Sequence, residues 1–582
     1  MLDRVFRRVT LIQIVTLLTA VISMLVDSII IAKYLGVTCV AAYGLAAPIL
    51  TLFAAIGGTF AQGAQTTASK ALGTGDTDLA SRLLSVAVLI GLIVSILGTV
   101  LVIVIANPIA LAFGAGESSE LLSSTVGYIR GYILGAPGLV LLLILLPFMQ
   151  LDGDRNRAIV GAIAMTIVDI ALDLMNVFLF KGGMFGMGLA SAASAYVALV
   201  ILLLHFIKKN IIFRLSFKKI DKASVKPIVM TGMPYALGQL CRTFLVITLN
   251  RLFLWVSDDG STTIAAFSVV NTVYSVMCIP GSAVGTAAVM VAGIMSGEEN
   301  KSGLKETMQA FLKYALVLNV IVTALVLLFA PNIIGIFLHD NPETLSIAVT
   351  GTRFVAVSMI LAAVTGGFRN FYQGVGRTKL TGLLCILNTY VFIVVPAVIL
   401  GSLLGTKGIW IAFLVVDVLV MITIFIVNAI YLHRIPTHLM DFSMLPADFG
   451  VTDEDLKEYS PASMDEVMEA SLGISEFCKE HGADLRTRMT VSLAIEEMGA
   501  NVMSHKAKTR GKKHYNVRVF IKNGSWTVRM QDDYPTFNPK EYVEIYEKSD
   551  KTDVIGLKMI MGLARDVQYL NTLDLNNLII SI

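Results

Sequence analysis

Charged residues are scarce in this chain. They make up 15% of its 582 residues, and 55% are hydrophobic, whereas a soluble globular domain averages about 25% charged residues. This composition excludes an ordinary soluble protein. Cysteine is also rare: the five cysteines have neither the spacing of a zinc site nor that of a disulfide framework. No nucleic-acid-binding motif is present either, so we expect no nucleic acid among the partners.

Long apolar runs fill the first three quarters of the chain instead. Runs such as 83–106 and 314–330 approach or exceed the roughly 20 residues that cross a bilayer as a helix. The basic start is followed by no small-residue cleavage site, which predicts a retained first helix rather than a signal peptide. We predict an all-α polytopic membrane protein with twelve spans, near 11–34, 41–69, 83–112, 124–149, 158–180, 187–207, 228–256, 263–295, 314–338, 346–372, 382–401 and 408–432.

The short loops between these spans differ in charge from one side to the other. Basic residues gather on one side, at 4–8, 155–157 and 208–226, while most loops of the other side hold acids. Because Lys and Arg are enriched in cytoplasmic loops, we predict that both termini are cytoplasmic and that the protein lies in the cell's inner (cytoplasmic) membrane. Basic loops also attract anionic membrane lipids.

The membrane part contains an internal repeat. Residues 39–76 parallel 263–300, so that Gly73 corresponds to Gly297, and "QLDGDR" at 150–155 parallels "QGVGR" at 373–377. Two six-helix halves of one orientation have their symmetry axis along the membrane normal, which is a transporter arrangement with the substrate site between the halves. The predicted segments are a lobe at 1–207, a basic linker at 208–227, a second lobe at 228–432, a linker at 433–450 and a soluble domain at 451–582, hereafter the tail.

Several polar residues interrupt the apolar runs. Asp27 lies in the first span, and Asp169, Asp173 and Asn176 share one face of the fifth. An acid at the bilayer centre costs about 2.5–3.5 kcal/mol on insertion scales, so such acids are candidate functional residues. Two carboxylates this close disfavour double ionisation, so they suit a proton or a bound cation. The weaker candidates of the second half are Asn250, Asn388 and Asp417.

A structural role for these acids is the alternative, as partners in salt bridges between helices. The arginines in or near the membrane lie in the second half, whereas three of the four acids lie in the first, which favours the functional interpretation. The arginines concerned are Arg242, Arg251, Arg353 and Arg369.

The tail has the pattern of an α+β fold. Residues 488–506 have helical periodicity, and 515–533 read as two strands joined by Asn523-Gly524, a strong hairpin signal. A helix leading into a strand follows at 554–570, and 575–582 close the chain as a last strand. This order predicts a two-layer cytoplasmic domain of helices packed on an antiparallel sheet.

The membrane part resembles the multidrug and toxic compound extrusion (MATE) transporters in its motifs "VDSIIIAKYLG", "GAQTTASKALGTGD", "QLDGDRNR" and "FYQGVGRTK". The resemblance covers about residues 10–432. It implies a two-lobed antiporter that exports cationic amphipathic compounds in exchange for H⁺ or Na⁺. It places the family's first-helix acid at Asp27, and an asparagine–aspartate pair of one branch at Asp169 and Asp173. The first of that pair is an aspartate here, which leaves the coupling ion open.

The tail resembles the ATP-binding domain of anti-sigma-factor kinases and histidine kinases. The resemblance implies a general-base-like Glu497, a magnesium-binding Asn501, an adenine-contacting Asp532 and a phosphate-turn Gly556. Tyr534 and Thr536 replace loop glycines of that family, and side chains there obstruct a close ligand approach. ATP with Mg²⁺, phosphoryl transfer, and a nucleotide-free module that contacts a regulatory protein therefore all stay open for the tail.

These patterns predict an efflux antiporter with a degenerate ATP-binding-like regulatory tail. A transporter is not an enzyme, although residual ATP binding or kinase activity of the tail stays open. Two alternatives belong to other classes: a membrane sensor that controls a kinase or anti-sigma module, and a flippase for lipid-linked precursors.

Overall fold

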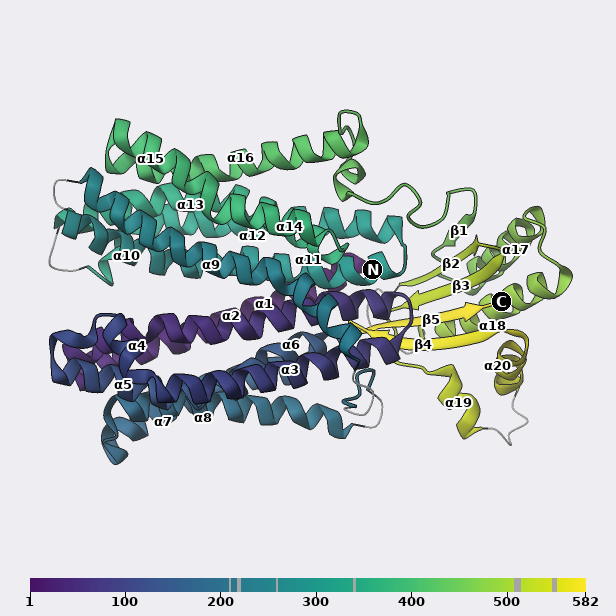
Figure 1. Cartoon of the computed structure of the whole chain (residues 1–582). Coiled ribbons are helices and arrows are strands. Elements are labelled where there is room, and N and C mark those ends of the chain that lie inside the picture. Colours follow the sequence, from purple (N-terminus) through teal and green to yellow (C-terminus); the bar gives the residue numbers. More distant parts are fainter. Residues whose placement is uncertain (209–210, 217–220, 258–259, 339–341, 507–513, 547–551) are drawn as a thin grey trace.

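The membrane part consists of two helical lobes that lie side by side (Figure 1). In this computed structural model the described residues are 1–582 apart from 209–210, 217–220, 258–259, 339–341, 507–513 and 547–551, so parts of the predicted basic linker lie outside the described residues. The N-lobe comprises α1 (Leu2–Ile30), α2 (Val37–Gly73), α3 (Thr77–Val104), α4 (Ala106–Ala112), α5 (Ser119–Ile133), α6 (Ala136–Leu151), α7 (Arg155–Met175) and α8 (Gly183–Leu203). The C-lobe comprises α9 (Val225–Val256), α10 (Gly260–Met277), α11 (Ile279–Gly297), α12 (Lys301–Gly335), α13 (Pro342–Gly374), α14 (Thr378–Ile386), α15 (Phe392–Leu404) and α16 (Thr406–Leu432).

The helices confirm the predicted spans. Within the described residues, eleven are long and apolar enough to cross a membrane, or twelve if α5 and α6, bent by 46°, form one span. The predicted span 263–295 is two helices, because α10 ends at Met277 and Pro280 lies in the first turn of α11; proline cannot donate the backbone bond that a continuous helix needs there. The predicted span 83–112 is likewise divided between α3 and α4.

Residues that correspond in the two repeats have corresponding roles in the structure. Asp76 caps α3 by accepting a hydrogen bond from Leu79 N, at 2.7 Å, and Asn300 caps α12 by accepting one from Gly303 N, at 2.8 Å. The paired glycines meet each other: a Cβ on Gly73 would lie 2.7 Å from Gly297 Cα and 2.2 Å from the carbonyl oxygen of Ile294. The lobes therefore touch backbone to backbone where α2 and α11 end, close to the tail.

The tail is a five-stranded antiparallel sheet with helices on one face. The strands β1 (Leu456–Tyr459), β2 (Tyr515–Lys522), β3 (Ser525–Asp532), β4 (Asp566–Thr572) and β5 (Leu575–Ser581) have the order β1-β2-β3-β5-β4. The helices are α17 (Met464–Glu480), α18 (Leu485–Lys506), α19 (Pro539–Ile545) and α20 (Thr552–Leu563). The predicted hairpin is confirmed, since Asn523 and Gly524 between β2 and β3 both have positive φ, at 51° and 76°.

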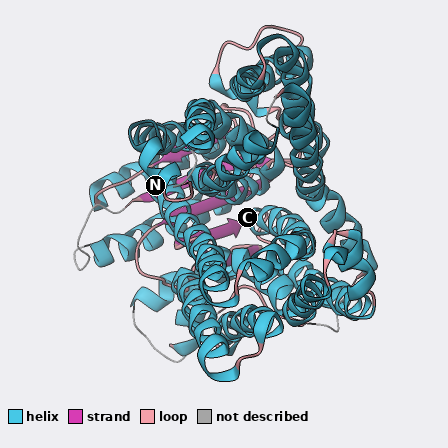
Figure 2. Cartoon of the chain, turned by 90° about the vertical axis from the view of Figure 1, so that its left-hand side faces the viewer, coloured by secondary structure: helices cyan, strands magenta, loops and turns pink. Residues whose placement is uncertain are grey.

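The two faces of the sheet are buried against different partners. Alternate residues such as Val528 and Met530 join the core that α17, α18 and α20 cover. The intervening residues Arg518, Arg529 and Gln531 are also buried, and they face the membrane part. Viewed from the side opposite the tail, the strands lie behind the helices of both lobes (Figure 2). The sheet is therefore covered on both sides, and the transporter supplies the second cover.

The contact between Gly73 and Gly297 gives a stability prediction. Replacing either residue by alanine puts a methyl group against backbone atoms, and overpacking of this kind costs about 1–3 kcal/mol. We expect Gly73→Ala and Gly297→Ala to lower the thermal unfolding midpoint of the purified protein, measured by a thiol-reactive or intrinsic-fluorescence melt. Gly44→Ala in the same α2 helix is the control, because a Cβ there meets nothing within 4 Å. Equal midpoints for all three variants would contradict the proposed packing.

Candidate functional site

Three acids of the N-lobe form one buried group. Asp27 lies near the end of α1, while Asp169 and Asp173 lie one turn apart on α7, and all three are buried. Their carboxyl groups act electrostatically on one another. Asp169 is held in place: Ser23 Oγ donates to its Oδ2 at 2.5 Å, and Ser194 Oγ donates to its Oδ1 at 3.3 Å. The structure thus brings together the three acids that the sequence placed on two separate helices.

Asp173 differs from Asp169 in its surroundings. Its carboxyl group lies within hydrogen-bonding reach of Asp27, but its oxygens have no other hydrogen-bond partner among the described residues. Two buried carboxyl groups this close are costly unless a proton or a cation neutralises the charge between them. Asp173 is therefore the member of the group best suited to exchange an ion.

Asn176 makes hydrogen bonds to the turn that follows α7, and its predicted place in the cavity stays a prediction. Its Oδ1 accepts a hydrogen bond from Gly182 N at 3.0 Å, and its Nδ2 donates to the carbonyl oxygen of Gly183 at 3.0 Å. These bonds hold the turn between α7 and α8. The i, i+7 spacing predicted a shared face correctly, but at this position the helix has passed into a π-helical segment, Asn176–Phe180, and the side chain serves the turn.

The weaker candidates of the C-lobe fall into two places. Asn388 and Asp417 line a cavity of about 390 Å³, together with Arg242 and Arg369; its lining comes from the C-lobe apart from Gln62 of α2. This volume lies in the range of small-molecule sites. Asp417 Oδ1 accepts hydrogen bonds from Thr365 Oγ1 at 2.7 Å and from Asn388 Nδ2 at 3.0 Å. Asn250 is not among the lining residues.

The tail binds both lobes through one buried charge pair. Glu298 follows the last residue of α11, and its side chain is 1% exposed; its Oε1 lies 2.9 Å from Arg529 Nη1 on β3. Arg529 Nη2 donates to the carbonyl oxygen of Gly73 at 2.9 Å, at the end of α2. A single guanidinium group from the tail therefore contacts the C-lobe with one nitrogen and the N-lobe with the other.

Further polar contacts surround this pair. Gln531 Nε2 and Asn577 Nδ2 both donate to Oε1 of Glu298, at 2.9 and 3.1 Å. At the N-lobe, Arg4 Nη1 lies 2.5 Å from Asp533 Oδ2, and Arg155 pairs with Asp574. The sequence did not predict these residues as functional, because an Arg or Gln at an outward position of a strand is also what a solvated sheet face carries.

The linker between membrane part and tail is fastened to the C-lobe. Arg377 Nε donates to the carbonyl oxygen of Met444 at 2.7 Å, and Tyr431 Oη donates to that of Leu445 at 2.9 Å. Within the linker, Asp441 accepts hydrogen bonds from Arg434 Nη2 at 2.6 Å and from the backbone N of Thr437 at 2.8 Å. These hydrogen bonds fix the path of the linker, in addition to the restriction that its two prolines impose on the backbone.

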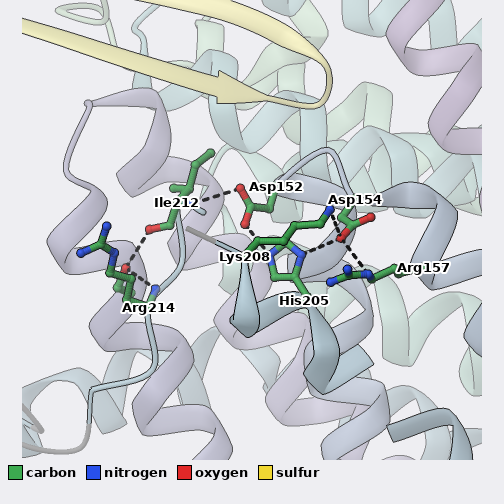
Figure 3. Close-up of polar contacts among 8 residues, drawn as sticks. Asp152, Asp154, Arg157, His205, Lys208, Ile212 and Arg214 are labelled. Atoms are coloured by element: carbon green, nitrogen blue, oxygen red, sulfur yellow. Dashed lines mark hydrogen bonds and ion pairs between the residues drawn. The ribbon is translucent and has the colours of Figure 1, made fainter. Parts of the chain in front are cut away.

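A second charge cluster lies inside the N-lobe, where the "QLDGDR" motif follows α6 (Figure 3). The ring of His205 lies between two carboxylates, with Nε2 2.6 Å from Asp152 Oδ2 and Nδ1 2.8 Å from Asp154 Oδ2. A doubly protonated imidazolium satisfies both contacts. Burial acts to raise the pKa of Asp154, but the hydrogen bonds from Lys208 and His205 outweigh it and lower that pKa. Since Asp152 also accepts from Ile212 N at 3.1 Å, the cluster anchors the linker after α8.

The predicted nucleotide site of the tail is occupied by the tail's own side chains. Oδ1 of Asp532 accepts hydrogen bonds from Tyr534 N at 2.9 Å and from Asn576 Nδ2 at 2.7 Å. The Tyr534 side chain is buried in the domain core, and this burial raises the pKa of its phenol. The space that remains beside Asn501, Asp532 and Tyr534 is a cavity of about 30 Å³, far below the roughly 300–1,000 Å³ of small-molecule sites.

Gly556 and Glu497, which the resemblance assigns to the phosphate end of that site, lie against each other. A Cβ on Gly556 would lie 2.3 Å from Cδ of Glu497, so the glycine of α20 packs directly against the predicted general base. Beside Asp532 the described residues leave a cavity too small for adenine; a role of Glu497, Asn501 and Gly556 toward phosphate and Mg²⁺ stays a prediction, and no step of the function is assigned to ATP.

The arrangement of two six-helix lobes around a central contact defines a membrane transporter, and comparisons with known proteins agree. The MatE family model matches residues 13–175 and 234–400. Two similar proteins are the multidrug export proteins MepA of Staphylococcus aureus (strain bovine RF122 / ET3-1), 23% identical over 382 residues, and of Staphylococcus saprophyticus, 25% identical over 374 residues. These matches cover 65% and 64% of this chain, and 82% and 81% of the relatives.

Solved structures agree with the fold. An outward-facing multidrug resistance MATE family transporter of the MOP superfamily superposes with a TM-score of 0.67 at 21% identity, over 72% of this chain and 94% of that one. A second family model, the histidine kinase-like ATPase domain, matches residues 460–582. The chain is an integral membrane protein that belongs to the MatE family and carries an ATPase-like domain at its C-terminal end.

The filled nucleotide site gives a binding prediction. We expect the purified full-length protein to show no saturable binding of a fluorescent ATP analogue with Mg²⁺ up to about 1 mM, a concentration at which binding energies are only about 4 kcal/mol. Fluorescence anisotropy with competition by unlabelled ATP measures this. Tyr534→Gly is the informative variant, because it removes the side chain that fills the site. Saturable binding by the unaltered protein, lost in Asn501→Ala, would contradict the prediction.

Proposed function

We propose that this protein is a secondary active multidrug efflux antiporter that exports cationic amphipathic compounds in exchange for H⁺ or Na⁺. The acid group of Asp27, Asp169 and Asp173 carries the proposal: among the described residues, none of the three has a Lys, Arg or His within 4.0 Å. Membership of the MatE family and the similarity to two multidrug export proteins support it.

Exchange follows from competition for one negative site. Three neighbouring carboxyl groups in apolar surroundings disfavour simultaneous ionisation, so the group takes up a proton, a sodium ion or a cationic compound. Asp169, fixed by two serines, holds its geometry, while Asp173 gains and loses the ion. Coupling requires that the ion and the compound prefer different facing states of the lobes, since a ligand shifts a conformational equilibrium only through differential affinity.

The proposed orientation puts both termini and the tail in the cytoplasm, with the protein in the cytoplasmic membrane. The positive-inside rule supports it, because Arg4, Arg155 and Lys301 lie on the side of the lobes that contacts the tail.

Asp173 gives the test of antiport. Replacing it by asparagine removes the exchangeable charge with little change in volume, and we expect a loss of at least about tenfold in ion-driven drug accumulation, equivalent to 1.4 kcal/mol. Proteoliposomes with H⁺ and Na⁺ gradients imposed separately measure it and identify the ion. Asp78→Asn on the exposed start of α3 is the control. Full ion-driven accumulation by Asp173→Asn would overturn the proposal.

We further propose that the tail is a nucleotide-independent regulator that stabilises the state in which the lobes meet on the tail side. The support is geometric. Arg529 contacts Glu298 of the C-lobe and Gly73 of the N-lobe, so parting the lobes at this end breaks at least one of the two contacts. Because Glu298 and Arg529 are both buried, loss of one partner leaves an uncompensated charge, a change worth about 3–5 kcal/mol.

Removing the Arg529 guanidinium tests this regulation. We expect Arg529→Gln to add a longer-distance population between spin labels at Lys70→Cys and Lys305→Cys, two exposed positions on the tail-side ends of the two lobes. Double electron–electron resonance measures this in full-length protein whose native cysteines have been replaced. Arg565→Gln, an exposed arginine of the tail, is the matched control. Identical distance distributions in all proteins would show that the tail does not hold the lobes together.

A further inference from the structure

Two arginines of the C-lobe point to a site for a negatively charged group. Arg242 lies on α9 and Arg369 on α13, and both side chains line the 390 Å³ cavity. A charged side chain at membrane depth is costly, and such residues ordinarily pair with an opposite charge. Among the described residues, no carboxylate lies within 4.0 Å of either guanidinium group.

Among the described residues, these two arginines have few hydrogen-bond partners. Arg242 Nη2 donates to Ser275 Oγ at 3.4 Å, and its guanidinium lies over the ring of Tyr274, 5.4 Å from the centroid. Arg369 Nη1 donates to Asn388 Oδ1 at 3.4 Å. Both bonds are long and go to neutral acceptors, whereas each guanidinium has five N–H donors. Tyr274 and Asn388 therefore orient the two groups without neutralising them.

The one acid in the cavity lining meets this need only in part, because Asp417 acts electrostatically on Arg369 but makes no ion pair with it within 4.0 Å. Asp417 is buried, and its Oδ1 is already engaged by Thr365 and Asn388. Counting formal charges, the lining has two arginines against one aspartate. The two lobes thus carry opposite charge in the membrane: three acids in the N-lobe, and an excess of guanidinium groups in the C-lobe.

We propose that the C-lobe cavity binds the anionic group of an amphipathic aromatic substrate, through charge-assisted hydrogen bonds from Arg242 and Arg369. The aromatic lining residues Tyr235, Phe267 and Phe413 pack against its rings. This inference rests on the proposed efflux function and deepens it by assigning the anionic group of the exported compound to two arginines of the C-lobe. In a zwitterionic compound, the positive group is the one that competes at the acids of the N-lobe.

A pair of dyes that differ only in this group tests the proposal. Rhodamine 110 has a free carboxylate, and rhodamine 123 is its methyl ester. Fluorescence anisotropy with the purified full-length protein gives the dissociation constant of each dye without any ion gradient. We expect Arg242→Gln with Arg369→Gln to weaken binding of the carboxylate dye at least about tenfold, because charge-assisted hydrogen bonds are the strong ones, and to change binding of the ester less than about twofold.

The same two helices offer matched controls. Arg251 on α9 and Arg353 on α13 are exposed and lie outside the cavity lining, so Arg251→Gln with Arg353→Gln is expected to leave both dissociation constants unchanged. If the double cavity variant does not fold, Arg242→Lys and Arg369→Lys, which keep the charge and lose the forked donors, are expected to give an intermediate loss for the carboxylate dye alone. Equal losses for both dyes, or no loss for either, overturn the proposal.

Gradient-driven uptake of the ester in proteoliposomes separates this inference from the proposed antiport. If the unaltered protein takes up neither dye with any gradient, the antiport fails, while the binding measurements still decide whether the two arginines select an anionic group.

Discussion

The tail side of this protein depends on the neutralisation of one buried carboxylate. Glu298 directly follows α11, and a helix C-terminus is the end at which a negative charge is disfavoured. Its partners Arg529, Gln531 and Asn577 all come from the outward face of the tail's sheet. The contact of Gly73 with Gly297 brings α2 and α11 close enough for Arg529 to reach both. The close packing of the lobes, the docking of the sheet and the burial of this acid thus require one another.

The same rule, that a buried charge needs a partner, divides the polar groups of the molecule into two kinds. Asp152, Asp154, His205 and Lys208 satisfy one another within the N-lobe, and Glu298 is satisfied by the tail. The acids of α1 and α7 and the arginines of the C-lobe cavity have no opposite charge at ion-pair distance among the described residues. Groups of the first kind fix the architecture, and groups of the second kind are where we propose that an ion or a substrate supplies the missing charge.

Much of the fold was predictable because its signals are local. Apolar runs identify the spans, Asn523-Gly524 identifies a hairpin, and the matched glycines identify the repeat. The predictions that failed in detail depended on events within a helix or on distant packing. Pro280 divides one predicted span, and a second predicted span is divided between α3 and α4.

The sites were predictable to a smaller extent. Asp27, Asp169 and Asp173 stand out because an acid in an apolar run is rare, whereas Arg529 and Glu298 resemble any surface pair until the structure places them together. Tyr534 could be named as a departure from a glycine loop, but the sequence could not tell that its ring would occupy the site itself.

The hydrogen bonds between the linker and the C-lobe attach the tail to one lobe more directly than to the other. Arg377 and Tyr431 of the C-lobe hold residues 444–445. If the lobes part as we propose, we therefore expect the tail to stay with the C-lobe and to lose its contacts with Arg4, Arg155 and the carbonyl oxygen of Gly73 in the N-lobe. Because the linker tethers the tail, the effective concentration of the tail at the N-lobe stays high, and rebinding is an intramolecular step. The free energy of rebinding then adds to the free-energy difference between the two facing states.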